Sequence, residues 1–310
     1  MLGRTLAIAM NTYREAVRAR VLLGLLAFAV CASLYSLVIA SMSIKQETRI
    51  VADLGSASIS LMSVLTAIIL GATSLYRELE LKTVFPILTR RLRRHEYVLG
   101  KYLGIVATLV AFVALDGAVV LGILAVQTKQ HLGATGGAAA GLFAVLAIAL
   151  VRAKHHRVFV FLPWSIAAFV VMALLASGAE GERQVLVVST VLTIAEVAIV
   201  TALATLFSAF SSPFLTAIFT VMVFLIGRSA DTLANLPERV FGSTVRTAGI
   251  VLARVFPNLY LYVPARPLLL GQVPNISLPG YVASAWLNAL LYAAVLLALS
   301  GLVFRRRDFQ

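Results

Sequence analysis

The sequence predicts an all-α, polytopic integral membrane protein with about eight spans. Of the 310 residues, 61% are hydrophobic and 13% are charged, whereas roughly a quarter of the residues in a soluble domain carry charge. Several apolar runs reach the ~20 residues that a helix needs to cross the hydrocarbon core of a bilayer. These runs do not alternate between apolar and polar residues, as the strands of a membrane β-barrel do.

The charge pattern indicates membrane topology and not nucleic-acid binding. The net charge is +13, but no basic domain or nucleic-acid motif accompanies it, and membrane proteins concentrate basic residues in cytoplasmic loops. The single cysteine, Cys31, excludes an intrachain disulfide and a C-x-x-C site. We therefore expect contact with membrane lipid and no nucleic-acid partner.

Motifs for nucleotide or metal chemistry are missing from the sequence. A P-loop needs G-x-x-x-x-G-K-[ST], and the only Gly-Lys pair, Gly100-Lys101, lacks the earlier glycine. The chain also has no HExxH motif and no His/Cys cluster with metal-ligand spacing. We expect no enzyme activity, no metal and no cofactor on this chain.

Residues 1–20 are expected to form an amphipathic helix along the cytoplasmic surface of the membrane. Leu6 and Met10 recur at helical spacing, and Arg14 and Arg18 share another face. This pattern is typical of helices that lie in the membrane interface. The alternative is an ordinary basic flank before the first span.

The transmembrane domain is expected over residues 21–310. In chain order, its predicted spans are 21–44, 56–75, 98–126, 133–150, 158–177, 185–208, 213–229 and 281–304. With the N-terminus inside, this threading places 17 lysines and arginines on the cytoplasmic side and nine outside. Only four of those nine lie in the short outer loops, which are the loops that the positive-inside rule weighs. Both termini are therefore predicted to be cytoplasmic.

The fourth and fifth predicted spans form a helical hairpin over residues 133–177. Gly133, Gly137 and Gly141 are spaced by four, and small residues at this spacing let helices approach closely in lipid. A flexible glycine–alanine loop is the alternative, but Leu142–Leu150 is too apolar for contact with water.

Residues 230–280 form a long outer segment in this threading. They hold six of the nine prolines, and proline interrupts helices. We expect short, broken helices there, lying at or dipping into the outer interface. Phe256, Tyr260 and Tyr262 would suit the headgroup level, where aromatic residues collect.

Two acids, Asp116 and Glu196, fall inside predicted spans. An ionised, unpaired carboxylate in the bilayer costs several kcal/mol, so such residues often mark functional sites. Because no Lys, Arg or His within a span offers a partner, we favour protonated or hydrogen-bonded acids at helix contacts over a role in a substrate path. Arg228 and Asp231, three residues apart at a span end, are expected to form a structural ion pair on one helical face.

The segment 76–97, between the second and third spans, carries an unusual density of charge. Acidic residues come first, the apolar stretch "TVFPIL" follows, and a group of arginines ends the segment. Apolar residues flanked by charge suit a helix that docks in a groove of a partner. The alternative is a basic anchor beside anionic lipid, which explains the arginines but not the acids before them.

The order of several segments resembles the membrane-spanning permease subunits of type 2, exporter-like ABC transporters. "NTYREAVRARVLLGLL" resembles the elbow helix and first span of that family, and "YRELELKTVFPILTRRLRRHEYVLGKYLG" resembles the stretch with its coupling helix. Residues 196–231 resemble its fourth and fifth core spans, and "VFPNLYLYVP" and "LVFRRRDF" resemble its outer segment and tail. The chain departs from the family at Arg91, where proline is usual, and in the hairpin 133–177, which is additional to a six-span core.

The resemblance implies a permease that forms half of a translocation pathway in the bacterial plasma (inner) membrane. Its partners would be a second permease, identical or related, and separate cytosolic ABC ATPase subunits that bind ATP and Mg. The implied ATPase-coupling residues are Glu78, Glu80, Thr83, Arg90, Arg93 and Arg94. The substrate stays open. Two other functions stay open as well: a secondary transporter or channel driven by an ion gradient, and a non-transporting membrane anchor for an ATPase complex.

Overall fold

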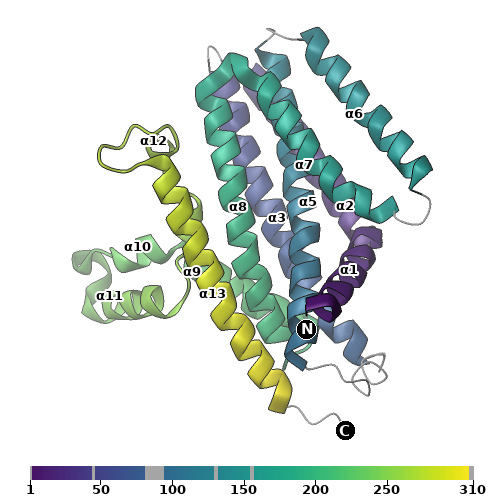
Figure 1. Cartoon of the computed structure of the whole chain (residues 1–310). Helices are drawn as coiled ribbons and strands as arrows, with labels where there is room; N and C mark the ends of the chain where they lie inside the picture. The colour runs from purple at the N-terminus through teal and green to yellow at the C-terminus, as the bar shows by residue number, and fades with distance from the viewer. Residues whose placement is uncertain (1, 44–45, 81–93, 129–131, 154–156, 307–310) are drawn as a thin grey trace.

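The computed structural model describes residues 2–43, 46–80, 94–128, 132–153 and 157–306 (Figure 1). Every regular element within these ranges is a helix, which confirms the predicted all-α class. The long helices are α1 (Leu2–Arg18), α2 (Arg20–Ser41), α3 (Glu47–Glu80), α5 (Arg94–Gln127), α6 (Leu132–Arg152), α7 (Arg157–Leu175), α8 (Glu180–Ser208), α9 (Pro213–Arg228), α11 (Glu238–Val255) and α13 (Leu278–Arg306). The short elements are η1 (Ala176–Ala179), α10 (Ala230–Ala234), η2 (Leu259–Tyr262) and α12 (Arg266–Leu269).

Six helical stretches in the described residues are long and apolar enough to cross a membrane, as expected of a multi-pass membrane protein. One of them, Arg157–Ser208, contains two helices, α7 and α8, joined by η1. The chain reverses direction at η1, so α7 and α8 run antiparallel (Figure 1). The helix α9 has 16 residues, fewer than the ~20 of a full crossing. The threading into eight spans therefore stays a prediction.

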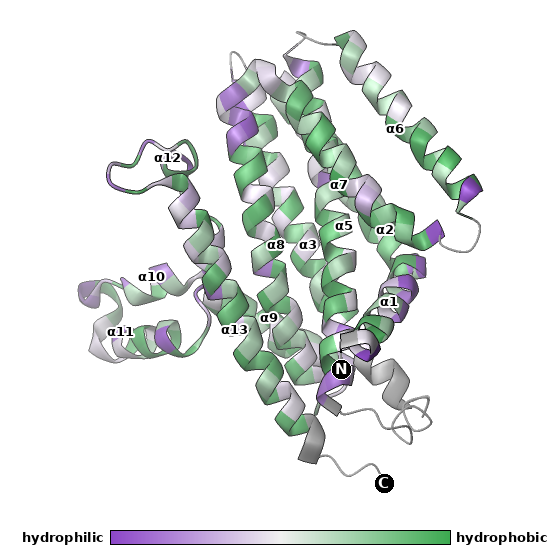
Figure 2. Cartoon of the chain, in the orientation of Figure 1, coloured by the Kyte–Doolittle hydropathy of each residue, from purple (hydrophilic) through white to green (hydrophobic). Residues whose placement is uncertain are grey.

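The outer surface of the bundle is apolar along its length. Figure 2 shows hydrophobic residues along α2, α7, α9 and α13 and hydrophilic residues mainly near helix ends. Leu23, Phe28 and Phe214 are exposed to 61%, 60% and 74%, respectively. A soluble monomer rarely exposes apolar surface of this extent, so the surface suits contact with lipid.

The core lies between α3, α5 and α8. Leu109, Leu192 and Ile199 are fully buried there. At Gly71 of α3 a Cβ would come within 2.5 Å of the Cβ of Ala204 on α8, so the missing side chain allows the two helices to approach closely.

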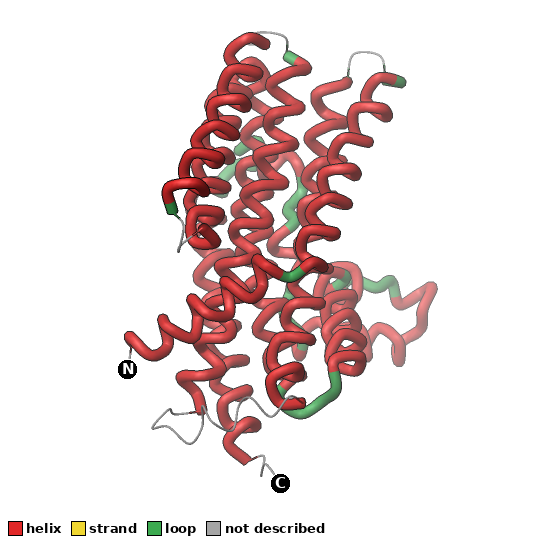
Figure 3. Tube along the Cα trace, turned by 90° about the vertical axis from the view of Figure 1, so that its right-hand side faces the viewer, coloured by secondary structure: helices red, strands yellow, loops and turns green. Residues whose placement is uncertain are grey.

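The amphipathic helix predicted over residues 1–20 is present as α1, and it packs against α5. Tyr13 is 4% exposed; its hydroxyl donates to the carbonyl of Val158 over 3.2 Å, and burial raises its pKa to about 12. Leu6 and Met10 are exposed to 60% and 43%, which leaves apolar side chains free for the membrane interface. In Figures 1 and 3 the beginnings of α1 and α5 and the ends of α3 and α13 lie toward the same end of the bundle.

The predicted hairpin over residues 133–177 consists of α6 and α7. Trp164 on α7 donates from Nε1 to the carbonyl of Leu142 on α6 over 2.9 Å. The glycines were expected to allow a close approach of another helix. A Cβ at Gly133, Gly137 or Gly141 would instead meet nothing within 4 Å. Within the described chain, these glycines therefore make no close helix contact.

The segment 230–280 is broken into α10, α11, η2 and α12, as its prolines predicted, but α11 has 18 residues and is longer than expected. The helix α11 is interrupted at Gly242, whose φ of 80° lies in the left-handed region that glycine tolerates. Together with α10, α11 projects from the side of the bundle, opposite α6 in Figure 1.

A substitution at Gly104 tests the seam between α1 and α5. A Cβ at this position would lie 2.6 Å from the carbonyl oxygen of Ala9 and 2.6 Å from the Cβ of Thr12. We expect Gly104→Leu to lower the free energy of unfolding by about 1–3 kcal/mol, as overpacking does, in a denaturant titration of the purified protein in detergent. Gly137→Leu is the matched control and should change it by less than about 0.5 kcal/mol. Equal effects at the two glycines would contradict the packing described for α1.

Candidate functional site

An ion pair between a buried acid and a partly buried arginine joins α8 and α9. Glu196 on α8 has an exposed fraction of 0%, and the guanidinium of Arg228, the last residue of α9, forms a salt bridge with its carboxylate. Ser60 on α3 donates from Oγ to Glu196 Oε2 over 3.1 Å, and Arg228 Nη2 donates to Ser60 Oγ over 3.2 Å. Three helices thus meet in one closed network of charge and hydrogen bonds, which we call the polar centre (Ser60, Glu196 and Arg228).

The short α9 explains why Arg228 lies inside the bundle. Sixteen residues span about 24 Å, so the helix ends before it has crossed ~30 Å of hydrocarbon. The backbone at Pro257 packs tightly against the end of α9. A Cβ at Gly227 would lie only 2.5 Å from the carbonyl oxygen of Pro257. A cation at the last position of a helix is also favoured by the helix dipole.

The polar centre corrects two expectations from the sequence. Glu196 was expected to have no basic partner within the spans, but it has Arg228. Arg228 was expected to pair with Asp231, but Asp231 instead accepts a hydrogen bond from Asn235 Nδ2 over 3.3 Å. The signal that could have indicated the true pair is the length of the apolar run that ends at Arg228, which is too short for a full crossing.

The second acid, Asp116, lies on α5 and is fully buried. Its Oδ1 accepts a hydrogen bond from Ser33 Oγ on α2 over 3.0 Å, whereas Oδ2 has no hydrogen-bond partner among the described groups. A buried carboxylate with an unpaired oxygen is unfavourable when ionised. The surroundings of Asp116 therefore favour a neutral acid at a helix contact.

A cleft of about 230 Å³ connects the polar centre with a second arginine, Arg266. Arg266 on α12 forms salt bridges with Asp53 on α3 and Glu182 on α8. Asp53 and Ser60 are seven residues apart on α3, which separates the two arginine sites by about 10 Å along the helix axis. The hydroxyls of Ser56, Ser189, Thr193 and Tyr262 line the cleft between them. These hydroxyls donate to protein carbonyls, and both arginines are neutralised by carboxylates, so the cleft carries little net charge.

The predicted ATPase-coupling residues lie at the edge of the described structure. Glu78 and Glu80 belong to the last turns of α3, and Arg94 is the first residue of α5; nothing is described of their side chains. Thr83, Arg90 and Arg93 lie outside the described residues, so their contacts stay predictions.

The beginning of α5, which follows this segment, packs against α1. Lys101 on α5 is 3% exposed, and its Nζ lies 3.8 Å from Glu15 Oε2 on α1. The seam around Gly104 lies one turn further along α5. Together these contacts hold α1 against the beginning of α5, next to the predicted coupling segment.

Neither metal chemistry nor a known relative supplies a function directly. Within the described residues, no group of three or more His, Cys, Asp or Glu side chains could hold a metal ion. No protein-family model and no curated protein matches the chain. Function is therefore inferred from the residues and geometry of the chain itself.

The polar centre is tested by removing one partner at a time. Arg228→Met leaves the fully buried carboxylate of Glu196 unpaired, and we expect a loss of about 3–5 kcal/mol in the free energy of unfolding. Glu196→Met leaves a partly exposed arginine and should cost less. The double variant Glu196→Met with Arg228→Met removes both charges and should lose less than the sum of the two single variants. Denaturant titrations of the four proteins in detergent give the coupling energy.

An exposed ion pair in α11 provides the control for this cycle. Glu238 and Arg246 form a salt bridge with about half of each side chain exposed, and such pairs contribute about 0–1 kcal/mol. Glu238→Met should therefore be nearly neutral. Additive losses for the Glu196 and Arg228 variants would show that the two side chains do not interact as described.

Proposed function

We propose that this chain is the membrane-spanning permease subunit of an ATP-driven ABC transporter of type 2, an exporter. It forms half of the translocation pathway, paired with a second, identical or related permease in a bacterial inner membrane with both termini in the cytoplasm. Separate cytosolic ABC ATPase subunits bind ATP and Mg and hydrolyse the nucleotide. The proposal starts from the order of segments that resembles this family, from the elbow helix to the basic tail.

The observation that carries the proposal is the pair of long helices around the charged segment. The helices α3 and α5 have 34 residues each, or about 51 Å, which exceeds the ~30 Å of hydrocarbon that a span has to cross. The polar end of α3 and the start of α5 lie at the end of the bundle where α1 begins (Figures 1 and 3). A docking segment between two rigid helices of this length transmits displacement from the cytosol into the bundle.

The polar centre connects this displacement with the interior. Ser60 belongs to α3, the same helix whose end leads into the coupling segment. Movement of α3 along or against α8 changes the distance from Ser60 to Glu196 and Arg228. Hydrogen bonds weaken steeply as their distances and angles depart from the optimum. Such a network therefore has distinct closed and open arrangements and suits alternation between two states.

The polar centre also bears on the alternative functions. The hypothesis of an ion-gradient transporter depended on two acids without basic partners. Glu196 is paired with Arg228, so only Asp116 still supports that hypothesis. A non-transporting anchor would use the same docking segment as a permease, so that segment does not separate these two hypotheses. ATP-dependent movement of substrate in sealed vesicles separates the permease from the anchor.

The coupling segment is tested by replacing one acid and one arginine. We expect Glu80→Ala with Arg93→Ala to lower co-purification of the ATPase and ATP-driven transport by about tenfold or more, because truncating charged partners at an interface costs about 2–5 kcal/mol. Membrane insertion should be unchanged. The control is Glu238→Ala with Arg246→Ala, which removes one exposed acid and one exposed arginine elsewhere. Unchanged ATPase binding and transport in the first variant would refute the docking role.

The topology is tested by cysteine labelling from outside the cell. In a Cys31→Ser background, Arg93→Cys should react with an impermeant maleimide only after the membrane is opened, because the segment faces the cytosol. Glu180→Cys is the matched position at the opposite end of the bundle, at the start of α8, and should react in intact cells. Reaction of Arg93→Cys in intact cells would invert the scheme.

A further inference from the structure

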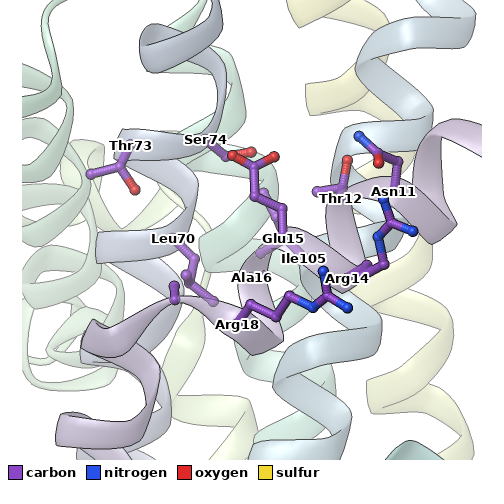
Figure 4. A pocket seen from close by; sticks show the side chains of 11 residues that line it. Asn11, Thr12, Arg14, Glu15, Ala16, Arg18, Leu70, Thr73, Ser74 and Ile105 are labelled. Atoms are coloured by element: carbon purple, nitrogen blue, oxygen red, sulfur yellow. The ribbon is translucent and has the colours of Figure 1, made fainter. Parts of the chain in front are cut away.

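A groove of about 470 Å³ lies between α1 and α3. Figure 4 shows Asn11, Arg14 and Arg18 on the α1 side and Thr73 and Ser74 on the α3 side. Apolar side chains, including Leu70 and Ile105, complete the lining. The groove is therefore polar on two sides and apolar toward the interior of the bundle.

The charges of the groove leave two arginines without compensation. Glu15 also lines it, but Lys101 lies against Glu15 from α5. Arg14 and Arg18 are both exposed and form no salt bridge with a described carboxylate. They are four residues apart, so they share one face of α1. The groove therefore carries a net positive charge of about two, held on a single helix face.

One hydrogen-bonding group of the groove is buried and unused. Thr12 is 2% exposed and lines the groove, and its Oγ1 has no hydrogen-bond partner among the described groups. Because this oxygen has almost no accessible surface, a ligand in the groove contacts the exposed polar side chains of the lining instead.

The depth of the groove identifies the class of ligand. On α2 the apolar run starts directly after Arg20, and on α3 it ends before Arg77. Arg18 and Ser74 thus lie within three residues of these two boundaries, at the level where hydrocarbon gives way to headgroups. Phospholipid phosphates occupy this level, and arginine binds phosphate oxygens with short, charge-assisted hydrogen bonds.

We propose that this groove binds the headgroup of one anionic phospholipid. Arg14 and Arg18 hold the phosphate, Asn11 donates from its side-chain amide, and the hydroxyl of Ser74 faces the remainder of the headgroup. The acyl chains continue along the apolar surfaces of α2 and α3. An anionic lipid is favoured over a zwitterionic one because Glu15 is already neutralised and the two arginines are not. The bound lipid bridges α1 and α3, whether or not an ATPase docks nearby.

Lipid retention in the purified protein tests the site. The protein is exchanged into micelles that contain equal amounts of phosphatidylglycerol and phosphatidylcholine, and native mass spectrometry counts the lipids that remain bound. We expect one tightly retained phosphatidylglycerol and a loss of at least about tenfold in its affinity for Arg14→Gln with Arg18→Gln, since both arginines bind the phosphate through charge-assisted hydrogen bonds. Excess inorganic phosphate should not displace the lipid, because it lacks acyl chains.

Two further variants make the result specific. Arg152→Gln with Arg157→Gln removes two exposed arginines from the facing ends of α6 and α7, outside the groove, and should leave retention unchanged. Asn11→Leu with Ser74→Ala keeps the net charge and should weaken retention, which tests the site even if the arginine variant fails to insert. Equal losses from both arginine pairs would mean unspecific attraction to the basic surface and overturn the proposal. Equal retention of the two lipids, or displacement by inorganic phosphate, would overturn it as well.

Discussion

A carboxylate that has no access to water governs the middle of the bundle. Glu196 is fully buried on α8, and a charge in such surroundings is tolerated only when it is paired and hydrogen-bonded. Arg228 supplies the charge and Ser60 the hydrogen bond. The helix α9 ends at Arg228, and the chain then leaves sideways into α10 and α11. The end of α9 thus places the arginine beside the buried acid.

A helix that ends inside a membrane domain exposes backbone groups that need partners, because lipid offers none. Here other backbone groups of the chain supply some of these partners. The amide of Ser229 bonds to the carbonyl of Leu225, and the amide of Leu233 bonds to the carbonyl of Ser229. The helix α11 then covers α10 so closely that a Cβ at Gly249 would lie 2.6 Å from the carbonyl oxygen of Leu233. These contacts give partners to part of the backbone at the end of α9, whereas most side chains of α10 and α11 are exposed.

Hydropathy predicts where the helices lie but not which side chains meet. The predicted range 133–150, for example, corresponds to α6, Leu132–Arg152, because a lipid environment restricts both the length and the composition of a helix. The partner of Arg228 could not be predicted in this way, since Glu196 is 32 residues away and the pairing depends on where α9 ends. The glycine pattern was similarly incomplete: the spaced glycines of α6 lie open, whereas the isolated Gly71 makes a close helix contact. The spacing of glycines in the sequence shows that a helix face could approach another helix closely. Whether another helix lies against that face depends on the fold.

The helix α3 contributes to both arginine sites and to the groove beside α1. From one end to the other, Asp53 pairs with Arg266, Ser60 belongs to the polar centre, Gly71 lies against α8, and Ser74 lines the groove beside α1. A rigid helix cannot change one of these contacts without moving the others, because its residues are fixed relative to one another by the backbone ladder. A displacement of the end of α3 therefore shifts the groove, the close contact with α8 and the polar centre together. The helix α3 is thus the element that couples this end of the bundle to its interior.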